Sequence, residues 1–140
     1  MTDDVRRFQG AEIAGFIHRT LVAAEMPSAD ARIVAELMAE ADVNGSDGHG
    51  VFRLPGYIRR IKEGGLNLTP NIHVEKEKSG MALVNGDNGQ GHLVMKYCAE
   101  LATKKAKESG VAWVGSHDSN HAGPAALYAK MPMAENMIGL

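Results

Sequence analysis

Two stretches near the start of the chain alternate apolar and polar side chains with the period of a helix. From residue 11 to residue 25, apolar residues recur at spacings of three and four, and the same spacing recurs from residue 33 to residue 41. This spacing places apolar side chains on one face of a helix. Pro27 and Ser28 interrupt the pattern, and Ser28 can cap the second helix. We therefore expect two amphipathic helices that pack against each other.

A third helix is expected after the turn-forming residues 44–48. His49, Arg53 and Tyr57 follow at intervals of four residues, so a helix that starts at about His49 would place an imidazole, a guanidinium and a phenol on one face. Together these groups could hold a small carboxylate. Pro55 fits a helix only near its first turn, which requires the helix to begin at or just before this stretch.

Shorter segments follow, separated by glycine and proline. Gly64 and Gly65 can end the third helix, residues 72–75 predict a short strand, and the alternating charges of residues 75–80 predict a solvated turn. The remaining expected elements are a strand at 81–84, a glycine-rich loop at 86–91, a helix at 93–108, a buried strand at 111–115, a helical piece from Pro124 interrupted at Pro132, and the opening of a strand at 137–140. A strand, a helix and a strand in this order pair in parallel by default, which indicates an α/β fold.

Composition narrows the class of protein. The chain has 140 residues, 44% of them hydrophobic, which suffices for one ordinary core. Its 15 basic and 17 acidic side chains are mixed along the sequence, which argues against a nucleic-acid or anionic-membrane surface. No apolar run approaches the roughly 20 residues of a membrane span. The single cysteine, Cys98, excludes an internal disulfide and fits the reducing cytoplasm, and its helical setting predicts a buried, inert thiol.

Residues 116–123 contain two histidines directly after an expected strand, at the edge of the sheet where α/β proteins place ligands. Histidine gives or takes a proton near neutral pH, as alcohol oxidation or carbonyl reduction requires. The residues alone do not choose between His117 and His121. With His49 they could also form a metal site, and hence a metal-dependent hydrolase, but no further ligand completes a recognisable spacing. We therefore expect no metal.

The glycine-rich loop invites comparison with a dinucleotide fold. Gly86, Gly89 and Gly91 follow a strand and precede a helix, and Asp118 comes after the next strand, as in a Rossmann unit. The order of the glycines is G-x-x-G-x-G, however, and Asp118 lies in a polar segment beyond the strand. A tight turn that allows close packing is the favoured interpretation, ahead of a phosphate-binding loop.

Four motifs together resemble a known family, the malate/L-lactate dehydrogenases, which are NAD(P)H-dependent oxidoreductases. These motifs are Asp47-Gly-His-Gly-Val-Phe-Arg-Leu-Pro-Gly-Tyr57, Gly64-Gly-Leu-Asn67, Asn85-Gly-Asp-Asn-Gly-Gln-Gly91 and Ser119-Asn-His-Ala-Gly123. The resemblance covers nearly the whole chain and implies a non-Rossmann α/β fold. It implies an N-terminal helical segment at residues 1–78 that carries substrate-site residues, and the first part of a nicotinamide-binding domain at 79–140. Members are typically more than twice this length and form homodimers, so the chain looks like an N-terminal portion.

The resemblance also implies roles for single residues. His121, within the Ser-Asn-His-x-Gly motif, matches the catalytic histidine of the family. His49, Arg53 and Tyr57 match positions that line the substrate site, with Arg53 suited to a carboxylate. Asn120 and His49 are expected beside the cofactor, NAD or NADP.

Two departures from the family pattern concern the substrate. Gly48 stands where a serine is common, and Ala122 stands where an aromatic residue is frequent. His117 lies outside the motif. The resemblance implies hydride transfer between NAD(P)H and a small 2-hydroxy or 2-oxo acid of the malate or lactate type. One alternative is NADPH-dependent reduction of cyclic imino acids, and another is a non-catalytic fragment that acts only as an interaction or folding unit.

Overall fold

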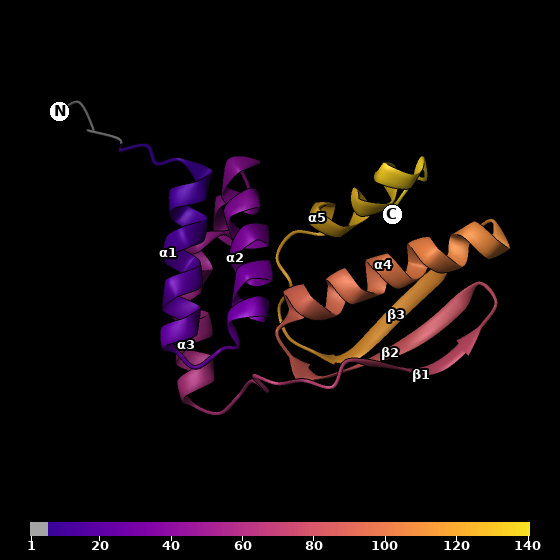
Figure 1. Ribbon diagram of the computed structural model, residues 1–140, viewed down its shortest axis with the longest axis horizontal. Coiled ribbons are helices and arrows are strands. Elements are labelled where there is room, and N and C mark those ends of the chain that lie inside the picture. Colours follow the sequence, from indigo (N-terminus) through magenta and orange to yellow (C-terminus); the bar gives the residue numbers. More distant parts are fainter. Residues whose placement is uncertain (1–5) are drawn as a thin grey trace.

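The computed structural model describes residues 6–140, which form a helical part and a part in which helices cover a sheet (Figure 1). The helical part contains α1 (Gly10–Ala23), α2 (Ser28–Val43) and α3 (Leu54–Lys62), with two 3-10 turns, η1 (Asp47–His49) and η2 (Val51–Arg53), before α3. The second part contains β1 (His73–Lys78), β2 (Met81–Gly89), α4 (Gly91–Ser109), β3 (Trp113–Ser119), α5 (Ala126–Ala129) and η3 (Met131–Glu135).

Helices α1 and α2 pack against each other as their apolar stripes predict. Ile17 and Leu21 of α1 lie in one buried cluster with Val34 and Met38 of α2. The predicted cap is wrong, because Pro27 occupies the N-cap position and no side chain caps the helix. The hydroxyl of Ser28 instead lies 3.2 Å from Nε2 of His18 on the neighbouring helix.

Helix α3 begins five residues later than a start at His49 would require. The backbone of Gly50 (φ −91°, ψ −137°) interrupts helical geometry, so His49 and Arg53 lie in separate 3-10 turns. The N–H of Val51 donates to the Asp42 carboxylate at 2.8 Å, which ties this segment to α2. The prediction that His49, Arg53 and Tyr57 share one face of a single helix is therefore wrong. Pro55 does lie in the first turn of α3, as predicted.

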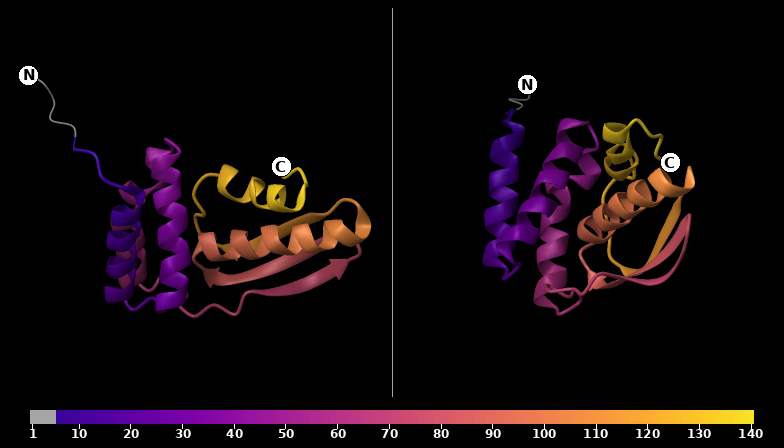
Figure 2. Two further views of the ribbon diagram at one scale, coloured as in Figure 1. Left: turned by 45° about the horizontal axis from the view of Figure 1, so that its top comes forward. Right: turned by 45° about the vertical axis from the view of Figure 1, so that its right-hand side comes forward.

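The sheet has the strand order β1-β2-β3. Strand β1 pairs with β2 in antiparallel orientation, and β2 pairs with β3 in parallel orientation, which confirms the predicted parallel pair. Helix α4 covers one face of the sheet, and α5 lies on the other side of α4 (Figure 2). Val84 from β2 packs against Val94 and Cys98 from α4, and Cys98 is buried as expected.

All three strands extend beyond their predicted ends. Strand β1 includes residues 75–78, which the charge pattern assigned to a turn; an edge strand tolerates charged side chains because both faces of this segment meet water. Strand β2 continues to Gly89 through the predicted glycine-rich loop, with a shift of register between Asn85 and Gly89. Strand β3 includes the first half of the expected histidine loop, and it is only half-buried.

The last part of the chain folds back over α4 and α2. Leu37 and Ala41 of α2 form a buried cluster with Leu127 and Tyr128 of α5. The helical piece after Pro124 is present, and a 3-10 turn replaces it around Pro132. Residues 137–140 form no strand, contrary to expectation. No helix within residues 6–140 is long and apolar enough to cross a bilayer.

The predicted boundary at residues 78 and 79 stays a prediction, although β1 lies before it and pairs with β2 after it.

Candidate functional site

The centre of the candidate site is a hydrogen bond between Tyr57 and His121. The Tyr57 hydroxyl, on α3, lies 2.6 Å from Nδ1 of His121, in the segment after β3. Tyr57 is 8% exposed, whereas His121 is exposed to solvent. The pair thus joins a buried phenol to an accessible imidazole.

His49 lies directly against this pair. Its ring stacks on that of His121, with 5.4 Å between ring centroids and 2° between ring planes. Nδ1 of His49 is buried and has no hydrogen-bond partner within residues 6–140. The structure therefore brings His49, Tyr57 and His121 together, as the motifs predicted.

Arg53 acts on the pair through its charge. Its Nε donates to the carbonyl oxygen of Gly48 at 2.8 Å, and the side chain is exposed. The positive charge of Arg53 lowers the pKa of both Tyr57 and His121. The guanidinium is thus close enough to the pair to meet an anion bound beside it.

The protonation states follow from burial and from these neighbours. Partial burial lowers the pKa of His121, and the charges of Arg53 and His49 lower it further. Burial raises the pKa of Tyr57 to about 12, against the opposing effects of Arg53 and the Gln90 side chain. At neutral pH we therefore expect a neutral imidazole and a neutral phenol.

We expect the neutral ring of His121 to carry its proton on Nε2. The backbone N–H of Gly123, which can only donate, points to Nδ1 at 3.4 Å, and the neutral Tyr57 hydroxyl is the second group at that nitrogen. Nδ1 is thus the acceptor and Nε2 the donor. Because both hydrogen bonds go to Nδ1, Nε2 is the nitrogen that can meet a ligand.

Asn120 holds the segment before His121 in place. Its side-chain nitrogen donates to the backbone oxygens of Asn88 and Gly89, each at 2.9 Å. The amide is thereby engaged with the end of β2, and contact of Asn120 with a cofactor stays a prediction.

The glycines of the supposed phosphate loop serve close packing. A Cβ atom on Gly86 would lie 2.7 Å from the backbone oxygen of Asp118, and one on Gly91 would lie 2.0 Å from that of Asn120. Backbone atoms occupy the space beside these glycines. This supports the predicted role of these glycines in close packing, although residues 86–89 belong to β2 and not to a turn.

Sequence reasoning missed two polar residues at this turn, Gln90 and His92. Both are buried, and Gln90 reaches His92 and the backbone of His121. The sequence does contain a signal for them. Gln90 lies directly before the apolar helix and His92 lies in its first turn, but the prediction for this segment rested only on the glycines around them.

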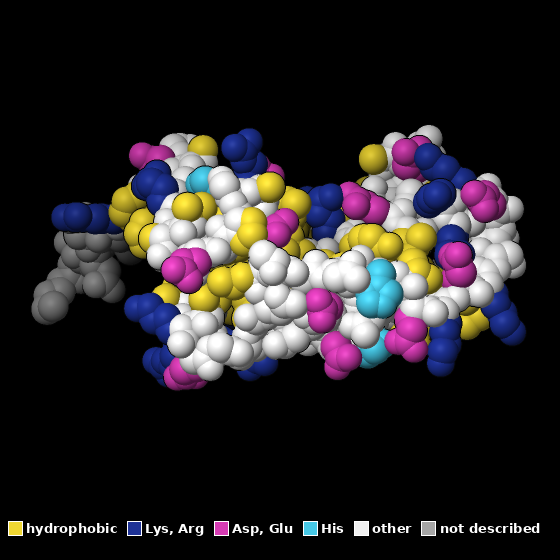
Figure 3. All heavy atoms as spheres, turned by 60° about the horizontal axis from the view of Figure 1, so that its bottom comes forward, with side chains coloured by type: hydrophobic (Ala, Val, Ile, Leu, Met, Phe, Trp, Pro, Cys, Tyr) yellow, Lys and Arg dark blue, Asp and Glu magenta, His cyan; other side chains and the backbone are white. Residues whose placement is uncertain are grey.

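His117 lies apart from the site. Its Nε2 is 2.6 Å from Glu75, its Nδ1 is 3.1 Å from Asp118, and these carboxylates raise its pKa. Figure 3 shows histidine and acidic side chains side by side over the strands. Residues 6–140 contain no group of three His, Cys, Asp or Glu side chains placed to hold a metal ion.

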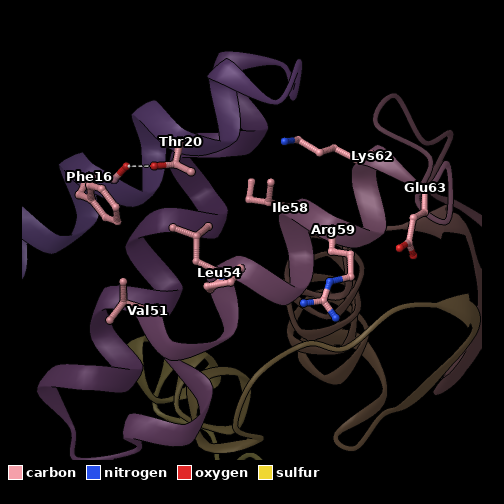
Figure 4. Close-up of a pocket in the computed structure, with 9 residues that line it drawn as sticks. Phe16, Thr20, Val51, Leu54, Ile58, Arg59, Lys62 and Glu63 are labelled. Carbon is pink, nitrogen blue, oxygen red and sulfur yellow. Dashed lines mark hydrogen bonds between the residues drawn. The ribbon is translucent and has the colours of Figure 1, made fainter.

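A hollow of about 670 Å³ lies between α1 and α3, away from the candidate site (Figure 4). Its lining is mostly apolar and consists of Phe16, Thr20, Val51, Leu54, Pro55, Ile58, Arg59, Lys62 and Glu63. None of the predicted site residues lines it.

Comparison with known proteins assigns the family. The sequence profile described as malate/L-lactate dehydrogenase matches residues 8–140, and the chain belongs to this family. It is 44% identical over 125 residues to a malate dehydrogenase of Pyrococcus horikoshii, a match that covers 89% of the chain and 35% of the relative. It is 41% identical to an L-sulfolactate dehydrogenase of Methanocaldococcus jannaschii, over 82% of the chain and 33% of the relative.

The fold agrees with this assignment. The structure of the Pyrococcus horikoshii malate dehydrogenase superposes with a TM-score of 0.92 at 40% identity, over 96% of this chain and 39% of that one. A Δ1-piperideine-2-carboxylate reductase from Pseudomonas syringae superposes with a TM-score of 0.83 at 25% identity, over 94% of this chain and 40% of that one. The chain therefore spans little more than a third of the length of these relatives.

Proposed function

We propose that the complete protein is an NAD(P)-dependent oxidoreductase that acts on a small 2-hydroxy or 2-oxo acid of the malate or lactate type. The observation that carries this proposal is the hydrogen-bonded pair of Tyr57 and His121, with His49 stacked on it and Arg53 beside it. The named activities of the malate and sulfolactate dehydrogenases support the same reaction class.

The nicotinamide would supply or accept the hydride at the carbon next to the carboxylate. In the reductive direction, charge develops on the carbonyl oxygen, and His121 donates its Nε2 proton to that oxygen. The Tyr57 proton can follow to Nδ1 across the 2.6 Å contact, so the imidazole stays neutral. Burial disfavours the phenolate that this transfer leaves, the positive charge of Arg53 offsets part of this cost, and the phenolate then regains a proton from solvent. The oxidative direction reverses each step.

Arg53 is also the group best suited to hold the substrate carboxylate. A guanidinium binds a carboxylate through two parallel hydrogen bonds, and the terminal nitrogens of Arg53 are not used by its bond to Gly48. His49, stacked on His121, would lie beside the reacting carbon and on the side of the nicotinamide.

The alternative of a cyclic imino acid reductase has a specific basis in the likeness to the Δ1-piperideine-2-carboxylate reductase. Such a substrate also places an unsaturated carbon next to a carboxylate, so the same residues would serve. The higher identity to malate and sulfolactate dehydrogenases favours the hydroxy acid. The choice between NAD and NADP, the homodimer and the cytoplasmic location stay predictions.

A substrate panel on the protein expressed from its complete gene tests the proposal. With NADH and NADPH, we expect reduction of oxaloacetate, pyruvate or sulfopyruvate, and slower or no reduction of Δ1-piperideine-2-carboxylate. His121→Asn should lower kcat by about 10²–10⁴-fold, the usual contribution of general acid catalysis. His117→Asn is the matched control, because His117 binds Glu75 outside the site, and its kcat should equal that of the unmodified protein.

Failure to reduce any substrate of the panel would favour the non-catalytic alternative. Near-normal turnover by His121→Asn would overturn the role of His121 alone.

A further inference from the structure

The turn between β2 and α4 buries two polar side chains behind the candidate site. Gln90 is 2% exposed, and His92, in the first turn of α4, is fully buried. Polar side chains are seldom buried to this extent unless they are hydrogen-bonded. Their neighbours are Tyr57 and His121, the two residues of the proposed proton transfer.

Gln90 links His121 to His92. Its Nε2 lies 3.3 Å from the backbone oxygen of His121 and 3.0 Å from Nδ1 of His92. A carbonyl oxygen only accepts, so the amide nitrogen of Gln90, not its oxygen, must face it. The second amide hydrogen can then go to Nδ1 of His92, and in that arrangement we expect the proton of that ring on Nε2. One side chain thus anchors the main chain of His121 to a second, buried imidazole.

His92 also contacts Tyr57 directly. Its ring meets the Tyr57 ring edge to face, with 5.8 Å between centroids and 82° between planes. Burial, together with the charges of His121 and His49, lowers the pKa of His92 to about 3, so the ring stays neutral at physiological pH. A neutral ring can lie beside His121 without repelling a proton there.

The segment after His121 is fitted closely to His92. A Cβ atom on Gly123 would lie 3.1 Å from Nε2 of His92, and Gly123 has a φ of +78°, which favours glycine. Nε2 of His92 has no hydrogen-bond partner within residues 6–140. The ring therefore contributes its shape and its accepting Nδ1, while its own N–H is left unpaired against the backbone.

We propose that Gln90 and His92 are positioning residues that hold the Tyr57–His121 pair in register. Gln90 fixes the backbone from which the His121 ring projects, and His92 fixes both the amide of Gln90 and the ring of Tyr57. Loss of either contact frees the His121 ring to turn away from the Tyr57 hydroxyl. The kinetic consequence rests on the proposed function of His121, whereas the ring geometry does not.

The test uses the protein expressed from its complete gene, labelled with ¹⁵N-histidine, and the substitution Gln90→Leu. In the unmodified protein, the ¹⁵N chemical shifts of His121 should identify Nδ1 as the acceptor and Nε2 as protonated. In Gln90→Leu they should move toward a mixture of both tautomers, and the pKa of His121 should rise toward its ordinary value. We expect kcat to fall by about 10–100-fold with KM unchanged, because a displacement of a catalytic group by about 1 Å can reduce the rate by that factor.

Lys105→Met is the matched control on the same helix. Lys105 is also a largely buried polar side chain of α4, but it pairs with Glu77 at 2.8 Å and donates to the backbone of Lys78 at 2.9 Å, at the other end of the sheet. Its replacement should lower the Tm while the His121 shifts and kcat stay unchanged.

A second variant separates the two contacts. His92→Asn removes the ring that contacts Tyr57 but keeps an accepting oxygen near the position of Nδ1. Because the hydrogen bond from Gln90 is kept, kcat should fall less than in Gln90→Leu. If Gln90→Leu does not fold, the unmodified protein at pH 5 provides the test, because His92 should there be neutral with its proton on Nε2.

Two results would overturn the inference. One is a folded Gln90→Leu whose His121 shifts and kcat equal those of the unmodified protein, and the other is a His92 ring that carries its proton on Nδ1. Absence of oxidoreductase activity in the unmodified protein would overturn the proposed function instead, and the ¹⁵N measurements would still judge the positioning of His121.

Discussion

Arg53 is the residue whose charge acts on both members of the Tyr57–His121 pair. A cation beside an imidazole disfavours protonation of the ring, so Arg53 lowers the pKa of His121. Burial lowers this pKa most, and Arg53 lowers it further, so activity that requires the neutral ring is lost only as the pH falls through the lowered pKa of His121. Arg53 thus extends the active range toward acid.

We therefore predict that Arg53→Gln moves the acid limb of the kcat/KM profile to higher pH. The same substitution removes charged hydrogen bonds to the substrate, worth about 1.5–3 kcal/mol, so KM should rise roughly 10- to 150-fold. Steady-state kinetics from pH 5 to pH 9 measure both effects. Arg59→Gln, on the other side of α3, is the control and should change neither. An unshifted acid limb in Arg53→Gln would contradict the electrostatic role.

At the scale of elements, the segment between α2 and α3 depends on the absence of a side chain at one glycine. A Cβ atom on Gly50 would lie 1.8 Å from Oδ1 of Asp42, the carboxylate that accepts the N–H of Val51. Gly48, two residues earlier, has no atom within 4 Å of the corresponding position. The two glycines therefore differ in what they can tolerate.

Gly50→Ala should push the Asp42 carboxylate away and destabilise the protein by roughly 1–3 kcal/mol, the range for overpacked sites. Gly48→Ser should leave the Tm unchanged, because space is available, and should alter KM, because it adds a hydroxyl close to the bond between Arg53 and Gly48. Thermal unfolding and substrate kinetics of both variants provide the comparison. Equal Tm values for the two variants would contradict the packing argument.

At the scale of the whole molecule, the site is formed between two parts of the chain that are 64 residues apart at its central hydrogen bond. Contacts of α2 with α5 hold these parts together, through a buried cluster that includes Leu37 and Leu127. Tyr128 adds a hydrogen bond to the backbone oxygen of Ala122, the neighbour of His121. The packing of α5 thus bears on the position of the site.

Leu127→Ala should cost about 2–5 kcal/mol in stability, as other buried leucine truncations do, and should also lower kcat because the segment that carries His121 loosens. Ile17→Ala removes an equally buried side chain from the cluster between α1 and α2, at a similar cost. Its kcat at a temperature where both variants are folded should stay near that of the unmodified protein. Equal loss of kcat in both variants would indicate a general effect of stability.

Local patterns in the sequence determined the helices and their pairing. The apolar stripes of α1, α2 and α4 follow from a period that any helix shares, and Gly110, with a φ of +79°, ends α4. The motifs around His49 and His121 also predicted the candidate site residues through their resemblance to a family. These features depend on neighbours in sequence, which is why they could be read without the fold.

Only the tertiary structure decided where the strands end, where α3 begins and that Gln90 and His92 lie behind the candidate site. The charged residues of β1 form a strand because their backbone pairs with that of β2. Gly50 interrupts the expected helix, and the Asp42 side chain of α2 lies against it. Gln90 and His92 gain their meaning from Tyr57 and His121, which meet them only after folding. Contacts between distant segments have no local periodicity, so the sequence by itself could supply the chemistry of the site but not its arrangement.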